Sequence, residues 1–378
     1  MLTISEREKL FPVLADHCYL NTAWRGPISL PARDAVIQYT DGLMQHGVNN
    51  WDEWDGTFAE TRSMFADFIG ADSDEVIFLA HATDAFSRIV LGVDLHEGDE
   101  VIVPLRDYPG IVRPLLALRA RGVIVHLVPC RNDGSMPAED LLAEANERTR
   151  LIAVSHVDFR TGYRSDVLQL CLECRKLGIL SAIDFVQSVG ALPIDVHETG
   201  ADFATFASRK FLNSLDTLGV LYVRSKSMDA IKPHVMGTHS VVEPFNFDKV
   251  EQYAAPGTKR FLIGAPAMPV IYSLRAALKL QNGFGRNAIG ERVLGLSDTI
   301  RVEAHSRGFR CLGDDWTGPN RSQIICLIRE SRLADEGLKK QMEDANVAVS
   351  VRQGILRIAP HYYNNEQDVA KLFDALPS

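Results

Sequence analysis

Short apolar runs alternate with longer amphipathic stretches over the first two thirds of the chain. The apolar runs cover residues 75–80, 100–104, 123–128, 151–154 and 180–183, and the stretches between them have helical spacing. Strands that alternate with helices are joined by right-handed crossovers and form a largely parallel sheet. The pattern therefore predicts an α/β fold.

The pattern changes after about residue 255. A long helical stretch runs from residue 266 to 307, and shorter strands and a last helix over 366–376 follow it. Gly257 and the turn Gly264-Ala265-Pro266 are typical of a boundary between such regions. We predict a large domain over residues 16–255 and a smaller carboxy-terminal domain over 256–378, which residues 1–15 join.

Composition and charge narrow the function classes. The chain has 378 residues, 46% of them hydrophobic, and a formal net charge of −9, with no Lys/Arg cluster that would bind nucleic acid. The first nine residues carry charges where a signal peptide needs an apolar run, and no segment has the length and apolarity of a membrane span. We expect a cytoplasmic protein that acts on a small molecule, with neither nucleic acid nor membrane as partner.

The six cysteines are scattered through the chain, which is typical of reduced thiols. Cys171 and Cys174 form a Cys-x-x-Cys, a spacing found in zinc and redox sites. They lie inside an amphipathic stretch over residues 167–176, and no second pair of ligands is evident. We predict that both thiols pack on the buried face of a helix, and we expect no metal site.

Asp184 and Lys210 each follow an apolar run, Asp184 directly and Lys210 three residues after Ala207. The carboxyl ends of parallel strands share one edge of a sheet, where open α/β folds bind ligands. An amine that forms a Schiff base, together with an anion that keeps a pyridine nitrogen protonated, is what pyridoxal phosphate requires. Taken singly, the two residues could be a helix-capping carboxylate and a surface lysine. Together they predict a pyridoxal phosphate site.

Further segments extend this interpretation, in the order Tyr19-Leu20-Asn21-Thr22-Ala23, Ser155-His156-Val157, residues 184–196, Ser208-Arg209-Lys210 and residues 356–364. In this order the chain resembles the class V aminotransferases, which include cysteine desulfurases, kynureninases and isopenicillin N epimerase-like proteins. The resemblance implies the PLP-dependent transferase fold of type I. That fold has a large domain with a mainly parallel sheet flanked by helices, plus a smaller α+β carboxy-terminal domain. It also implies a homodimer.

The resemblance implies where the phosphate binds. It places Ala82 and Thr83 around the phosphate, at the start of a helix, although Thr83 could equally be an ordinary helix N-cap. Two hydroxyl ligands of the family are replaced, by Ala207 and by Ala265. Ser208 and Arg209 could compensate, because a guanidinium offers a charge-assisted, forked contact; a salt bridge elsewhere is the alternative for Arg209.

The segment after the lysine, residues 211–219, lacks the glycines usual in the family and carries an unexpected carboxylate, Asp216. This difference indicates either an unusual substrate or a degraded site.

The same resemblance implies which residues contact the cofactor ring. Tyr108 corresponds to the residue that stacks on the ring, although a loop aromatic could also fill surface space. Gln187 matches the position that hydrogen-bonds the ring hydroxyl, with a helix N-terminal contact as its alternative. Asp184 faces the ring nitrogen and Lys210 forms the Schiff base. We therefore predict Lys210, Asp184 and Tyr108 as the catalytic set.

Arg357 predicts an amino acid substrate. It lies in a short apolar strand, where an arginine is costly unless it meets an anion, and the family uses this residue to bind the substrate α-carboxylate. A buried structural ion pair is the alternative. Asn21, Trp24 and Arg25 are further candidates for the substrate pocket.

Several reactions begin with the same external aldimine and the same proton removal by Lys210. Transamination is the first hypothesis, and C–S or C–C lyase and epimerase activities are alternatives, as is a non-catalytic binding or scaffold protein. No cysteine lies between Cys326 and Arg357, which argues against a cysteine desulfurase. Residues 156–163 resemble kynureninase, but Arg209 stands where kynureninase has a tyrosine. The substrate is expected to be a small amino acid.

Overall fold

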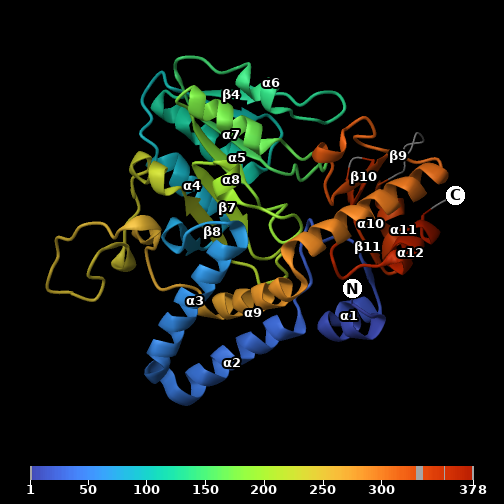
Figure 1. Cartoon of the computed structure of the whole chain (residues 1–378), viewed down its shortest axis with the longest axis horizontal. Helices are drawn as coiled ribbons and strands as arrows, with labels where there is room; N and C mark the ends of the chain where they lie inside the picture. The colour runs from blue at the N-terminus through green and yellow to red at the C-terminus, as the bar shows by residue number, and fades with distance from the viewer. Residues whose placement is uncertain (1, 329–334, 353, 377–378) are drawn as a thin grey trace.

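A seven-stranded sheet with helices packed around it forms the centre of the protein (Figure 1). The computed structural model describes residues 2–328, 335–352 and 354–376. The strand order is β2-β8-β7-β6-β5-β3-β4. The strands are β2 (Val76–Leu79), β3 (Glu100–Pro104), β4 (Ile124–Val128), β5 (Thr149–Ser155), β6 (Leu180–Asp184), β7 (Phe203–Ala207) and β8 (Gly219–Val223).

Only β8 in this sheet runs antiparallel to its neighbours, and the other adjacent pairs are parallel. The predicted α/β class with a mainly parallel sheet is therefore confirmed, and each of the five predicted apolar runs overlaps a strand. The sequence pattern did not indicate β8, because no helical stretch separates it from β7. It follows the loop that carries Lys210 and returns directly beside β7.

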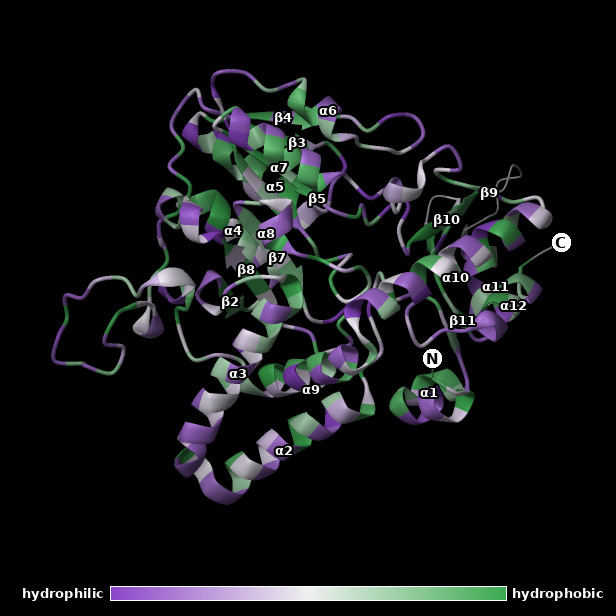
Figure 2. Ribbon diagram, in the orientation of Figure 1, coloured by the Kyte–Doolittle hydropathy of each residue, from purple (hydrophilic) through white to green (hydrophobic). Residues whose placement is uncertain are grey.

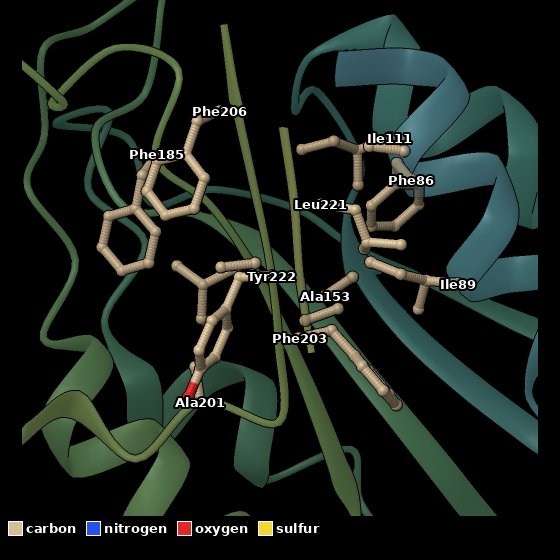
Figure 3. Packing of buried hydrophobic residues seen from close by; sticks show 14 of the residues in the cluster. Phe86, Ile89, Ile111, Ala153, Phe185, Ala201, Phe203, Phe206, Leu221 and Tyr222 are labelled. Carbon is tan, nitrogen blue, oxygen red and sulfur yellow. The ribbon is translucent and has the colours of Figure 1, made fainter. Parts of the chain in front are cut away.

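Most residues in the strands of this sheet are hydrophobic and buried, as a sheet covered on both faces requires (Figure 2). Successive side chains of a strand point to opposite faces, so Leu221 and Tyr222 of β8 enter different layers of the core. Figure 3 shows Leu221 on the side of Phe86, and Tyr222 on the side of Phe185 and Phe206. The rings of Phe185 and Phe206 stack with centroids 5.4 Å apart.

Helices follow the strands in the order that the alternation predicts. They are α4 (Ala82–Gly92), α5 (Pro109–Ala117), α6 (Ala138–Leu142), α7 (Val167–Lys176) and α8 (Val196–Thr199). Cys171 and Cys174 lie buried on α7 within the main core as free thiols, so their predicted packing role is confirmed.

The predicted helical stretch over residues 266–307 is two helices, α9 (Met268–Phe284) and α10 (Arg286–Ser306). Gly285 separates them with φ of 85°, a value that favours glycine. Buried side chains of α9, including Ile271 and Leu274, pack in the core of the large sheet. Beside α9 lie α2 (Leu30–His46) and α3 (Trp51–Ile69), as Figure 1 shows. The division of the chain at residue 255 stays a prediction.

A second, antiparallel sheet in the order β12-β13-β10-β9 forms the core of the carboxy-terminal part. Its strands are β9 (Arg310–Cys311), β10 (Ile325–Ile328), β12 (Ser350–Arg352) and β13 (Ile355–Ile358), and α11 (Asp335–Asp344) and α12 (Glu366–Asp374) accompany them. The amino terminus reaches this part: α1 (Ile4–Leu10) precedes β1 (Cys18–Tyr19), which pairs with β11 (Val347–Ala348). Within the described residues, no helix is long and apolar enough to cross a bilayer.

Arg7 of α1 holds the amino terminus against α12 through Asp368. Two hydrogen bonds of 2.9 and 3.0 Å join the guanidinium to the carboxylate, and both side chains are buried. We predict that Arg7→Met lowers the free energy of unfolding by about 3 kcal/mol, because Asp368 is left as a buried charge without its partner. Urea denaturation measures this loss.

The control is Arg33→Met, which removes an ion pair to Asp34 that is more than half exposed, and which should change stability by less than about 1 kcal/mol. Equal effects of the two substitutions would show that burial does not decide the contribution of Arg7.

Candidate active site

Asp184 and Lys210 meet at the carboxyl edge of the large sheet. Asp184 is the last residue of β6, and Lys210 follows the end of the adjacent parallel strand β7. Each residue is only 5% exposed. The sheet therefore brings together the two residues that the sequence predicted as the centre of the site.

Burial controls the charges of this pair. It lowers the pKa of Lys210 to about 7, against the opposing effect of Asp184, with Arg357 and Arg209 lowering it further. Burial likewise raises the pKa of Asp184 to about 6, although the backbone N–H of Val186 donates to its Oδ1 at 2.7 Å and Lys210 favours the anion. A neutral amine beside a carboxylate is thus accessible near neutral pH.

A cavity of about 440 Å³ opens beside Lys210. At one end lies the amino terminus of α4, whose free N–H groups and dipole favour an anion. The residues that line the cavity are His81, Ala82, Thr83, Asp84, Ser87, Tyr108, Val186, Ala207, Arg209, Lys210, Asp216, Thr217 and Leu218. Ala82, Thr83 and Arg209, predicted as phosphate contacts, thus line the same cavity as Lys210.

The structure does not bring Ser208 to this cavity. Its hydroxyl donates to the carbonyl of Leu215 at 2.6 Å and is fully buried. The side chain of Ser208 therefore holds the turn after the lysine in place instead of facing the lined space.

Tyr108 forms one wall of the cavity. The Nζ atom of Lys210 lies 5.5 Å from the centre of its ring, and the ring of Phe159 meets it edge-on at 5.4 Å. Asp107 fixes this wall, because its buried carboxylate accepts hydrogen bonds from the backbone N–H groups of Tyr108 at 2.6 Å and Ser155 at 2.8 Å. A flat aromatic face beside the lysine suits a planar ligand.

Gln187 is buried three residues after Asp184 and does not itself line the cavity. Its Nε2 donates to the carbonyl of Ala23 at 3.1 Å, and its Oε1 is buried without a hydrogen-bond partner among the described residues. A buried acceptor in this condition favours a ligand that donates to it. Nearby, His156 Nδ1 and the hydroxyl of Ser188 are 2.9 Å apart.

Arg357 extends from β13 toward the wall formed by Tyr108 and Phe159. Its Nη1 donates to the carbonyl of Phe159 at 2.6 Å, and its Nη2 to the hydroxyl of Ser350 at 3.3 Å. Ser350 in turn donates to Asn21 at 2.8 Å. Arg357 and Asn21 are thus linked to each other and lie next to the cavity wall, although neither lines the cavity itself.

The other two predicted substrate contacts lie at the surface. Trp24 is 57% exposed, and Arg25 forms an ion pair with Asp216. The segment that carries them rests on the lysine loop, because Gly26 N–H donates to the carbonyl of Arg209 at 2.9 Å. A side chain at Gly26 would collide with the carbonyl of Lys210, so this close approach requires glycine.

Four residues that contact the predicted site residues were not assigned roles from the sequence. They are Asp107, Phe159, Ser350 and Val186. Asp107 directly precedes Tyr108, so a carboxylate beside the predicted stacking residue was an available signal. Ser350 offered none, because its contact with Arg357 depends on pairing of β12 with β13.

We predict that the reactivity of Lys210 in the cofactor-free protein rises through about pH 7, because burial favours the neutral amine, whereas an unperturbed lysine titrates near 10.4. Competitive labelling with trace acetic anhydride and mass spectrometry of the Lys210 peptide measures this. In Asp184→Asn the midpoint should move to lower pH, because the anion that favours the ammonium is gone. A midpoint near pH 10 in the natural protein would contradict the prediction.

The chain is similar in sequence to known proteins over most of its length. Residues 46–372 match the family model for class-V aminotransferases. The uncharacterized aminotransferase YcbU of Bacillus subtilis is 28% identical over 368 residues, which cover 97% of this chain and 96% of that protein. A probable cysteine desulfurase of Methanothermobacter thermautotrophicus is 25% identical over 394 residues, covering 97% and 95%.

Solved structures show the same fold. The apo cysteine desulfurase of Thermococcus onnurineus NA1 superposes with a TM-score of 0.87 at 18% identity, covering 99% of this chain and 97% of that one. A C-DES variant with glycine covalently linked to its PLP cofactor gives 0.89 at 22% identity, covering 97% and 98%. Since the family match spans most of the sequence, the chain belongs to the class-V aminotransferases and is a PLP-dependent enzyme.

Proposed function

We propose that this enzyme transaminates a small amino acid, with Lys210 and Asp184 as its central residues. The observation that carries the proposal is the buried lysine of lowered pKa beside a buried carboxylate, at the wall of a cavity large enough for a cofactor. Pyridoxal phosphate supplies, when bound, an aldehyde that condenses with amines and a ring that withdraws electrons from a substrate carbanion.

The residues of the site fit this group. The amino terminus of α4 with Ala82 and Thr83 offers N–H groups and a hydroxyl to a phosphate, and Arg209 adds a positive charge. Asp184 supplies an anion for the ring nitrogen. The unpartnered Oε1 of Gln187 suits the ring hydroxyl as a donor. We assign the stacking contact to Tyr108.

Lys210 is proposed to move the proton of the reaction. Its Nζ atom, neutral above about pH 7, would take the proton from the substrate Cα, and the ammonium so formed would deliver it to the carbon of the cofactor's former aldehyde, as transamination requires. The segment of Trp24, Arg25 and Gly26 rests on the lysine loop and is called the covering segment here. Tyr108 and this covering segment limit the access of water to that amine. The low pKa of Lys210 suits this role, because a base with a pKa near the working pH serves in both directions.

Arg357 is proposed to bind the substrate carboxylate. In support, Arg357 is 7% exposed and its guanidinium is oriented by Phe159 and Ser350, beside the wall formed by Tyr108. Asn21 is proposed to assist through Ser350. The surface positions of Trp24 and Arg25 give less support to their contact with a small substrate.

A C–S lyase is the second candidate, because a relative of similar length is named a probable cysteine desulfurase. The sequence lacks a cysteine between Cys326 and Arg357, and Cys326 itself is buried, with its thiol donating to the carbonyl of Arg160 at 3.1 Å. Elimination without a cysteine nucleophile is therefore the form of lyase chemistry that remains compatible with this site, beside C–C cleavage and epimerisation.

We further propose a homodimer in a reducing compartment such as the cytoplasm. All six cysteines are free thiols. The segment over residues 232–267 extends from the body of the protein (Figure 1) and exposes apolar side chains that a partner subunit would cover. They are Val235, Met236, Val242, Phe245, Phe247, Val250, Tyr253 and Ile263. Light scattering during gel filtration tests this, and a monomer at micromolar concentration would contradict it.

The main test is the visible absorption of the protein with pyridoxal phosphate, before and after addition of a panel of amino acids. We expect a band of lysine-linked cofactor that disappears in Lys210→Ala and shifts with the substrate. Formation of a 2-oxo acid without release of ammonia supports transamination. Release of ammonia or sulfide supports the lyase instead, and a protein that never gains the band would contradict both.

Arg357→Met is expected to raise KM for that amino acid at least about tenfold, because a charge-assisted contact with the carboxylate is lost. The lysine-linked absorption band should still form without substrate, since Arg357 is assigned no contact with the cofactor and influences Lys210 only through its charge. Steady-state kinetics gives KM, and Arg357→Lys should restore part of the loss. An unchanged KM in the methionine variant would show that Arg357 is a structural residue.

A further inference from the structure

Asp216 places a negative charge at the phosphate end of the cavity. It lines the same space as Thr83 and Arg209, which we assign to the phosphate, and its side chain is 34% exposed. The family resemblance gives this position no acidic role, because glycines are usual in this loop. The contacts of Asp216 therefore require an account of their own.

Two arginines share the carboxylate unequally. Oδ2 is in close contact with Arg25, whereas Oδ1 lies 3.5 Å from Nη1 of Arg209. Although Oδ1 is buried, it forms no hydrogen bond with a described residue. Arg25 is thus the closer partner of Asp216, and the longer contact leaves Arg209 able to turn to a stronger anion.

The backbone around Asp216 has little freedom to move away. Thr217 has φ of 64°, a left-handed value that β-branched residues rarely adopt. At Gly219 a side chain would collide with the backbone of His81, so the end of the loop is pressed against the start of α4. The carboxylate therefore stays near any phosphate that binds at α4.

We propose that Asp216 is an internal anion that competes with the cofactor phosphate for Arg209 and thereby sets the affinity for pyridoxal phosphate. When the phosphate binds Arg209, the ion pair with Arg25 keeps Asp216 in place and partly neutralises its charge. This inference rests on the proposed phosphate site, and it moves Arg25 from substrate binding to control of cofactor affinity.

Electrostatics gives the direction of each effect. A carboxylate repels a phosphate dianion at close range, and it occupies a guanidinium that the phosphate needs. Removing the charge of Asp216 should strengthen binding of a phosphorylated ligand without affecting a ligand that lacks phosphate. Removing Arg25 should weaken binding, because Asp216 then relies on Arg209 alone.

The experiment titrates the cofactor-free protein with pyridoxal phosphate and with pyridoxal, following the absorption of the lysine-linked ligand. The ratio of the two dissociation constants isolates the contribution of the phosphate. We expect Asp216→Asn to increase the preference for pyridoxal phosphate about tenfold, and Arg25→Met to reduce it several-fold. The double variant should match Asp216→Asn, because Arg25 acts only through Asp216.

Glu303→Gln is the control, because Glu303 also pairs with an arginine, Arg307, but lies on α10 outside the cavity. It should leave the preference unchanged. The natural protein could prefer pyridoxal phosphate to pyridoxal strongly, and Asp216→Asn could leave that preference unchanged. This result would overturn the inference and leave the proposed phosphate site intact. No preference in either protein would overturn both. A weak preference that Asp216→Asn increases would support the inference.

Discussion

The structure of the site depends on burying Asp184 and Lys210 together at the carboxyl edge of the sheet. Burial disfavours the charged form of each, while their mutual attraction favours it, so the pKa of the lysine falls to about 7 and that of the aspartate rises to about 6. This balance holds only if water is kept from both groups. Tyr108 and the covering segment at Gly26 lie over the sheet edge and exclude water. They are therefore needed for the shifted pKa values of Asp184 and Lys210.

The amino-terminal segment connects this edge to the carboxy-terminal part. It pairs with β11 at Cys18 and Tyr19, bridges Asn21 to Ala359, and then reaches the lysine loop at Gly26. A short stretch of chain thus fixes the antiparallel sheet that carries Arg357 relative to the loop that carries Lys210. The position of Arg357 relative to Lys210 is therefore set by backbone contacts.

Local patterns predicted the alternating strands, the sheet edge and the residues that stand directly at strand ends, such as Asp184. They could not predict contacts between distant segments. The pairing of Arg25 with Asp216 depends on how the covering segment crosses the lysine loop, and the direction of the Ser208 hydroxyl depends on the turn at Leu215. The strand β8 was missed for a related reason, because it returns beside β7 through the lysine loop with no helical stretch between the two strands.

The loop after Lys210 is held by side chains, although it lacks the glycines usual in the family. Asn213 and Thr217 keep left-handed backbone with φ of 55° and 64°, which costs roughly 1–2 kcal/mol at each position. Side chains that glycine lacks offset this cost: Asn213 donates to the carbonyl of Pro27 at 3.1 Å, and Ser214 donates to Ser273 at 2.9 Å. The loop thus keeps the geometry that glycines would allow, while its side chains fasten it to the segments around it. Contacts with neighbouring segments thus hold this strained loop in place directly after Lys210.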